Sequence, residues 1–324
     1  MKFWHRYNSW VKSLNWTQRA ILAIAEWAII GCLILGIFFW HKAHPLSVPA
    51  SLGDSIASQY LQIYTDLTNQ QAHVYFNFFN EFYRYFEREY FPVHQEKRLK
   101  VFLFGSPAAY RDYVEDRFKN YTPYGSYLGL KKNTIVVNLA SGIGTATHEL
   151  VHHFMAVGKI NHYSDWVNEG FPAFFEKFIG YLDSNGKLHI SLGYFSNWRF
   201  PLTKNVIDKY TLEALFKTRD QSVARSFNLF LHRQGCLSEY IKKLYNGEGR
   251  ADPVKTLEVV YGADLVTIER EWIGWVKSQP VDANVKLVER SFILPYPEWV
   301  RWWNLNREYL HWDEEKRLYV VKHS

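Results

Sequence analysis

A long apolar run near the N-terminus constrains this chain more than any other feature. Residues 21–40 read ILAIAEWAIIGCLILGIFFW, in which Glu26 is the one charged side chain. A helix of twenty residues spans about 30 Å, which matches the hydrocarbon core of a bilayer. We therefore predict one transmembrane helix over residues 20–40, preceded by the short segment 1–19 and followed by the bulk of the chain.

The charges on either side of this run predict its orientation. Four Lys or Arg side chains lie within residues 1–19, whereas Lys42 alone follows the run closely. Because positive charge marks the cytoplasmic side of a membrane helix, we expect a cytoplasmic N-terminus and an extracytoplasmic main part. This segment explains most of the net charge of +6, and no basic block long enough for a nucleic-acid arm is present. We expect no nucleic-acid partner.

Two alternatives to a retained anchor are open. Residues 29–32 resemble a lipoprotein processing box that ends at Cys32, and residues 48–50 resemble a small-residue cleavage site. Both fit poorly, because Glu26 interrupts the apolar region and apolar residues continue for eight positions past Cys32. We favour a retained anchor. The second cysteine is Cys236, so we expect no disulfide framework.

Beyond the anchor the pattern predicts three segments. Residues 41–52 contain two prolines and indicate a linker. Residues 53–280 have the alternation of apolar and polar residues expected of one α+β domain. Residues 281–324 are rich in Trp and charged residues, and they indicate an extension that packs on the domain or contacts a protein partner.

Within 53–280 the hydrophobic periodicity predicts a small sheet followed by a mainly helical part. Tyr75, Phe79, Phe82 and Phe86 recur at helical spacing, which places them on one buried face. In chain order we expect a helix over 54–90, a strand over 100–104, a helix from 107, a strand over 133–139, helices over 145–157 and 169–181, a strand over 187–192 and helices over 211–279.

Residues 148–152 read HELVH and fall in the helix expected over 145–157. Side chains four positions apart share one face of a helix, so His148 and His152 can bind a single metal ion at about 2.0–2.1 Å. Glu149 follows the first histidine, where the H-E-x-x-H pattern has its general base. His153 is about 140° round the helix from His148 and cannot join it on the same ion.

A second motif supplies a third ligand. Residues 166–176 read WVNEGFPAFFE, and we expect this helix start to carry Glu169 back to the metal. His162, on the loop ten residues after His152, is the alternative third ligand. We favour Glu169 because of the N-E-G sequence around it.

HELVH followed by NEG resembles the gluzincin metallopeptidases, and more closely a bacterial peptidase-MA-like family. The resemblance covers residues 51–279 and rests on these two motifs. It implies a zinc peptidase domain in which one Zn²⁺ ion is held by His148, His152 and Glu169, with Glu149 as the catalytic general base.

The chain also departs from this family pattern. Many relatives have an acid four residues after the third ligand, where it contacts a ligating histidine, but this position is Ala173 here. Glu176, about two turns on, is the candidate for that contact. We find no match for the Tyr or His that stabilises the oxyanion in relatives, and Arg225 is the one candidate that we offer.

The sequence thus predicts a membrane-anchored, extracytoplasmic zinc metallopeptidase that acts on a peptide or protein substrate. We also expect the strand over 133–139 to pair with an extended substrate through backbone hydrogen bonds. One alternative is a non-catalytic, membrane-tethered binding or assembly protein that keeps the peptidase fold, with or without the metal. A second is a purely structural membrane protein whose aromatic C-terminal segment docks a partner. The presence of Glu149 favours the enzyme.

Overall fold

The structure is a computed structural model of the chain. It describes residues 46–279, except 54, 119–121, 162, 184, 186, 194–198, 218 and 249–251, together with Asn15, Thr17, 292–294, 310–313 and 318–321. The predicted span 20–40, His162 and most of the extension 281–324 lie outside these residues. Across the described part, no helix has both the length and the apolar character needed to cross a membrane.

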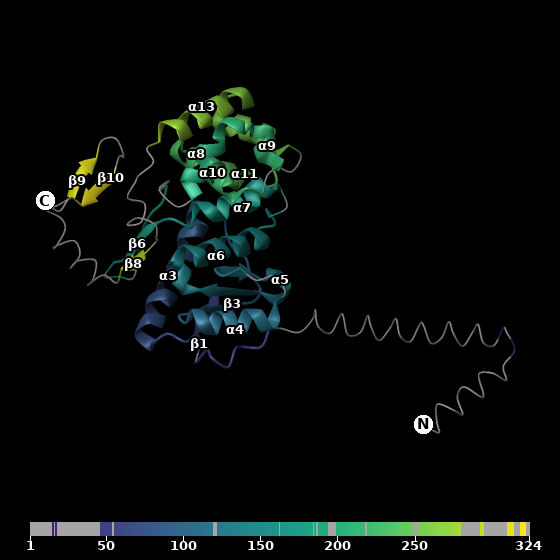
Figure 1. The fold of residues 1–324 in the computed structure, drawn as a ribbon, viewed down its shortest axis with the longest axis vertical. Coiled ribbons are helices and arrows are strands. Elements are labelled where there is room, and N and C mark those ends of the chain that lie inside the picture. Colours follow the sequence, from purple (N-terminus) through teal and green to yellow (C-terminus); the bar gives the residue numbers. More distant parts are fainter. Residues whose placement is uncertain are drawn as a thin grey trace, which may run out of the picture. The chain divides into compact units, whose positions relative to one another are not determined.

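Contacts within the chain divide it at Ser47 into two units, and the second, residues 48–324, carries both metal motifs. Its main sheet is mixed and has five strands in the order β1-β2-β3-β5-β4 (Figure 1). The central strands β2, β3 and β5 are parallel, and β1 and β4 are antiparallel edge strands. The strands are β1 (Ser55–Ala57), β2 (Leu61–Thr65), β3 (Leu99–Phe104), β4 (Gly125–Tyr127) and β5 (Thr134–Asn138).

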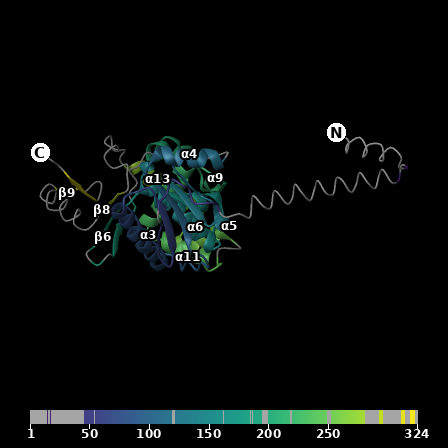
Figure 2. The ribbon, with the colours of Figure 1, turned by 90° about the horizontal axis from the view of Figure 1, so that it is seen from below.

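Helices cover both faces of this sheet (Figure 2). On one face Tyr113 packs its ring against Phe102 and Phe104 of β3. On the other face Phe82 and Phe154 stack in an apolar core. From the sheet this core contains Leu61, Ile63, Leu99, Val101, Leu103, Ile135 and Val137. The helices of this part are α3 (Asn69–Glu89), α4 (Pro107–Arg117), α5 (Gly129–Lys132), α6 (Ile143–Val157) and α7 (Asp165–Phe174).

The helix expected over 54–90 is wrong in its first part, where the chain forms the hairpin β1–β2. Alternate residues of β2 are buried, which is the period-two pattern of a strand. Thr68 then caps α3 with both hydrogen bonds of a capping box, so the helix begins only after it. The predicted aromatic face is confirmed for Phe79, Phe82 and Phe86, which are buried, whereas Tyr75 is only partly buried against the core.

The C-terminal half is mainly helical, as predicted, and its helices gather at the end of this unit away from α4 (Figure 1). They are α8 (Arg199–Val206), α9 (Leu212–Lys217), α10 (Gln221–Arg233), α11 (Leu237–Tyr245), α12 (Pro253–Tyr261) and α13 (Leu265–Ser278). Helix α10 packs along α7, and Trp272 of α13 lies against Phe227 of α10. The mixed α+β class that the sequence predicts is confirmed.

The helix expected over 169–181 is wrong at both ends. Helix α7 already begins at Asp165, after Ser164, so Glu169 lies one turn inside it. It ends at Phe174, and the chain then enters β6 (Ile179–Leu182), which pairs with β7 (Leu188–Ser191) and in parallel with β8 (Phe292–Leu294). Part of the C-terminal extension is therefore paired with the domain. The strands β9 (Leu310–Asp313) and β10 (Leu318–Val321) form a separate hairpin.

Candidate metal centre

Close packing of α6 against the end of α7 positions the residues of the candidate metal centre. Helix α6 passes so near the end of α7 that a Cβ on Gly144 would lie 2.0 Å from the carbonyl oxygen of Glu176. One turn later, Thr147 donates a hydrogen bond from Oγ1 to the carbonyl of Phe175 at 2.8 Å. Only glycine permits this approach, which brings His148 on α6 beside the segment that follows α7.

The structure brings together the three predicted ligands, His148, His152 and Glu169, whose donor atoms lie within 4.8 Å of one another. The two Nε2 atoms are 3.0 Å apart, and Glu169 Oε2 lies 4.0 Å from His148 Nε2 and 3.7 Å from His152 Nε2. A point equidistant from atoms with these separations is about 2.1 Å from each, the usual length of a Zn–N or Zn–O bond. Two imidazoles and one carboxylate at this spacing fit zinc.

The histidines and carboxylates of this cluster each favour the charged form of the other. Burial by itself would lower the pKa of His148, but contact with Glu176 and the nearby Glu149 and Glu169 outweigh it and raise the pKa. Burial would likewise raise the pKa of Glu169, yet hydrogen bonding and attraction to His152 and His148 lower it. The donor set is therefore a cluster whose carboxylate stays ionised, as a metal ligand must.

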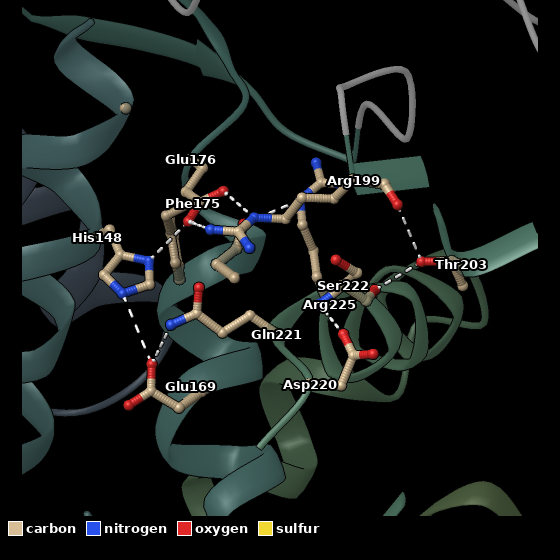
Figure 3. Close-up of polar contacts among 12 residues, drawn as sticks. His148, Glu169, Phe175, Glu176, Arg199, Thr203, Asp220, Gln221, Ser222 and Arg225 are labelled. Atoms are coloured by element: carbon tan, nitrogen blue, oxygen red, sulfur yellow. Dashed lines mark hydrogen bonds and ion pairs between the residues drawn. The ribbon is translucent and has the colours of Figure 1, made fainter. Parts of the chain in front are cut away.

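Glu176 is the carboxylate that contacts His148, the first predicted ligand (Figure 3). Its Oε1 lies 3.0 Å from His148 Nδ1, and its two oxygens accept hydrogen bonds at 3.0 Å from Nε and Nη2 of Arg199. Burial would raise the pKa of Glu176, but these two partners lower it to about 2. The prediction that Glu176 supports the first ligand agrees with this geometry. Arg199, at the start of α8, was not foreseen.

The predicted base, Glu149, is 9% exposed and lies beside the edge strand β4. Its Oε2 accepts a hydrogen bond from the backbone N–H of Tyr127 at 2.6 Å. This contact fixes one carboxylate oxygen and leaves Oε1 for other partners. It also places the base next to the sheet edge, because the Tyr127 N–H that it uses points away from β5.

The strand expected to receive a substrate is the wrong one. The run over 133–139 became β5, which is paired with β3 on one side and with β4 on the other, so neither of its edges is open. The edge strand next to the helix with the two predicted histidine ligands is β4, which among the described residues pairs with β5 alone. Sequence alone missed it because Gly125–Tyr127 is too short to show a period-two pattern.

The side chains of His153 and Arg225 lie away from the three donor atoms. His153 points to the other side of α6, where Nε2 is 2.8 Å from Gln95 Oε1, and burial lowers its pKa to about 3. Arg225 is 2% exposed and donates from Nε to the carbonyl of Ala173 at 2.9 Å. It therefore supports the end of α7, which argues against the oxyanion role suggested for it.

Comparison with known proteins adds no family assignment. No protein-family model matches the chain, and a search of curated proteins found no match. The resemblance to gluzincin metallopeptidases therefore rests on the two motifs and on the arrangement of His148, His152, Glu149 and Glu169.

Proposed function

We propose that this protein is a zinc-dependent metallopeptidase of the gluzincin type, which holds one zinc ion through His148, His152 and Glu169. The observation that carries the proposal is the convergence of these three donor atoms within 4.8 Å, with the carboxylate of Glu149 on the same helix. His148 and Glu149 are buried, and His152 and Glu169 are partly buried. Such a cluster of two histidines and two acids is more than an ordinary amphipathic helix requires. Perturbed ionisable groups gathered in this way are typical of catalytic sites.

When bound, zinc supplies Lewis-acid chemistry: it polarises a substrate carbonyl and lowers the pKa of water. Glu149 supplies the proton transfers. Its Oε2 is tied to the Tyr127 N–H, so Oε1 accepts a proton from the attacking water and returns it to the leaving amine nitrogen. General acid–base catalysis of this kind contributes about 10²- to 10⁴-fold.

The surrounding residues keep the ligands in place. Glu176 faces Nδ1 of His148, which leaves Nε2 of that ring toward the other donor atoms. Arg199 holds both oxygens of Glu176, so the carboxylate stays ionised and fixed in orientation. Such partners of a ligating histidine set its tautomer and raise its basicity.

The setting that we propose is extracytoplasmic, with the protein anchored by a helix over residues 20–40. The support is the apolar run with its preceding Lys and Arg residues. The substrate that we propose is a peptide or protein segment bound near the edge of β4, where Glu149 meets the sheet.

Hydrolysis of a peptide library by the zinc-loaded full chain tests this proposal. Glu149→Gln keeps the shape of the side chain and loses the basic carboxylate, so we expect a folded, zinc-loaded protein with hydrolysis at least about a hundredfold slower. A chelator should abolish the wild-type activity, and added zinc should restore it. A zinc-loaded wild type that cleaves no peptide would favour the non-catalytic binding protein, and an unimpaired Glu149→Gln variant would exclude Glu149 as the base.

A further inference from the structure

A side chain from the C-terminal helices reaches the metal cluster. Gln221, the first residue of α10, donates from Nε2 to Glu169 Oε2 at 2.6 Å (Figure 3). This is the same oxygen that lies 3.7 Å from His152 Nε2 and 4.0 Å from His148 Nε2. The hydrogen bond is therefore made to the ligating oxygen itself, and it determines which carboxylate oxygen faces the histidines.

The N-terminal cap of α10 fixes the backbone that carries the Gln221 side chain. Asp220 caps the helix by accepting hydrogen bonds from the backbone N–H groups of Ser222 at 2.8 Å and Val223 at 3.3 Å. These bonds satisfy donors that a helix otherwise leaves open in its first turn. Gln221 lies between the cap and this turn, so its backbone position is fixed with respect to the rest of α10.

Helix α10 is in turn fixed against the helix that carries the third ligand. A Cβ on Gly170 would lie 2.7 Å from Asn228 Nδ2 and 2.8 Å from both Cβ and the carbonyl oxygen of Ala224. Only glycine allows α7 and α10 to approach this closely. The glycine of the NEG motif therefore has a physical role: it brings α10 near enough for the Gln221 amide to reach Glu169.

We infer that Gln221 is a positioning residue, which orients the Glu169 carboxylate so that Oε2 is presented to the metal together with the two histidines. This inference rests on the proposed function, because it concerns the same zinc site. The side chain of Glu169 is 26% exposed, so without the amide its carboxylate can turn and be solvated. Residues that orient metal ligands typically contribute about 10- to 100-fold in metal affinity.

The test is the zinc affinity of the full chain, measured by competition with a chromophoric chelator. Gln221→Met keeps the length and apolar contacts of the side chain but removes the donor, so we expect zinc binding about 10- to 100-fold weaker. Gln221→Asn keeps an amide on an arm too short to reach Oε2, and it should show a similar loss. Gln234→Met, at the exposed opposite end of α10, is the matched control and should bind zinc as the wild type does.

A double variant separates positioning from general destabilisation. If Gln221 acts through Glu169, Gln221→Met should weaken zinc binding no further once Glu169→Ala is present. An equal loss in both backgrounds, or unchanged affinity in Gln221→Met and Gln221→Asn, would overturn the inference. In that case hydrolysis that still depends on Glu149 would leave the proposed function standing. Conversely, zinc affinity that depends on Gln221 in a protein without peptidase activity would support the inference and overturn the enzyme.

Discussion

Replacing Glu176 by Gln should destabilise the fold strongly, even without metal. The wild-type carboxylate binds Arg199 through two hydrogen bonds of 3.0 Å, and the two side chains are only 17% and 15% exposed. Removing one charge from a buried pair costs about 3–5 kcal/mol, because the other charge is left uncompensated. Since this pair keeps some exposure, we expect the lower end, about 3 kcal/mol.

Urea unfolding of the full chain in the presence of a chelator measures this loss. For a slope of about 3 kcal/mol/M, the midpoint should fall by about 1 M urea. Glu213→Gln is the matched control: it breaks a pair with Lys217 whose side chains are 80% and 73% exposed, so it should change stability by less than about 0.5 kcal/mol.

A second substitution identifies the cause of the loss. Glu176 stabilises the guanidinium groups of both Arg199 and Arg225. Arg199→Met in the Glu176→Gln background removes one of these two charges, so it should recover part of the lost stability. If Glu176→Gln is no more destabilising than Glu213→Gln, the Glu176–Arg199 pair contributes little to stability and the prediction is wrong. If it is destabilising but Arg199→Met gives no recovery, the loss does not come from the charge of Arg199.

Two further predictions concern helix α6. Burial lowers the pKa of His153 to about 3, so below pH 6.5 the unfolded chain binds a proton that the folded chain excludes. Between pH 7 and pH 5 this should lower the free energy of unfolding by about 2 kcal/mol. If denaturation of His153→Gln has the same pH dependence as that of the wild type, the prediction is wrong. Gly144→Ala would put a Cβ 2.0 Å from the carbonyl oxygen of Glu176, so it should lower the free energy of unfolding in urea by about 3 kcal/mol. The control is Gly274→Ala in α13, where an added Cβ has no neighbour within 4 Å and should raise the free energy of unfolding by about 0.5–1 kcal/mol. Similar effects of the two substitutions would exclude the close packing at Gly144.

The donor set could be predicted from the sequence because its information is local. His148 and His152 are one turn apart, so any helix over HELVH places them on one face. Glu169 follows at a separation that one loop and one turn of helix can span. The structure confirms that the three side chains form one cluster able to hold a metal ion, although the start of α7 was expected four residues too late.

The supporting residues could not be predicted, because long-range packing brings them to the site. Arg199 lies 23 residues after its partner Glu176, and Gln221 lies 52 residues after Glu169. Neither occurs in a pattern that indicates its role. Gln221 reaches Glu169 because α10 packs closely against α7, and this packing requires that Gly170 has no side chain.

The zinc content of the purified full chain is the decisive measurement for the proposed metal site. The wild type should carry close to one zinc per chain, and His148→Ala, His152→Ala and Glu169→Ala should each lose most of it, because two remaining protein ligands rarely hold zinc tightly. The control His73→Ala, on the exposed side of α3, should keep its zinc, and so should His162→Ala. Undiminished zinc in both His148→Ala and His152→Ala would contradict the account, and a greater loss in His162→Ala than in Glu169→Ala would exclude Glu169 as the third ligand.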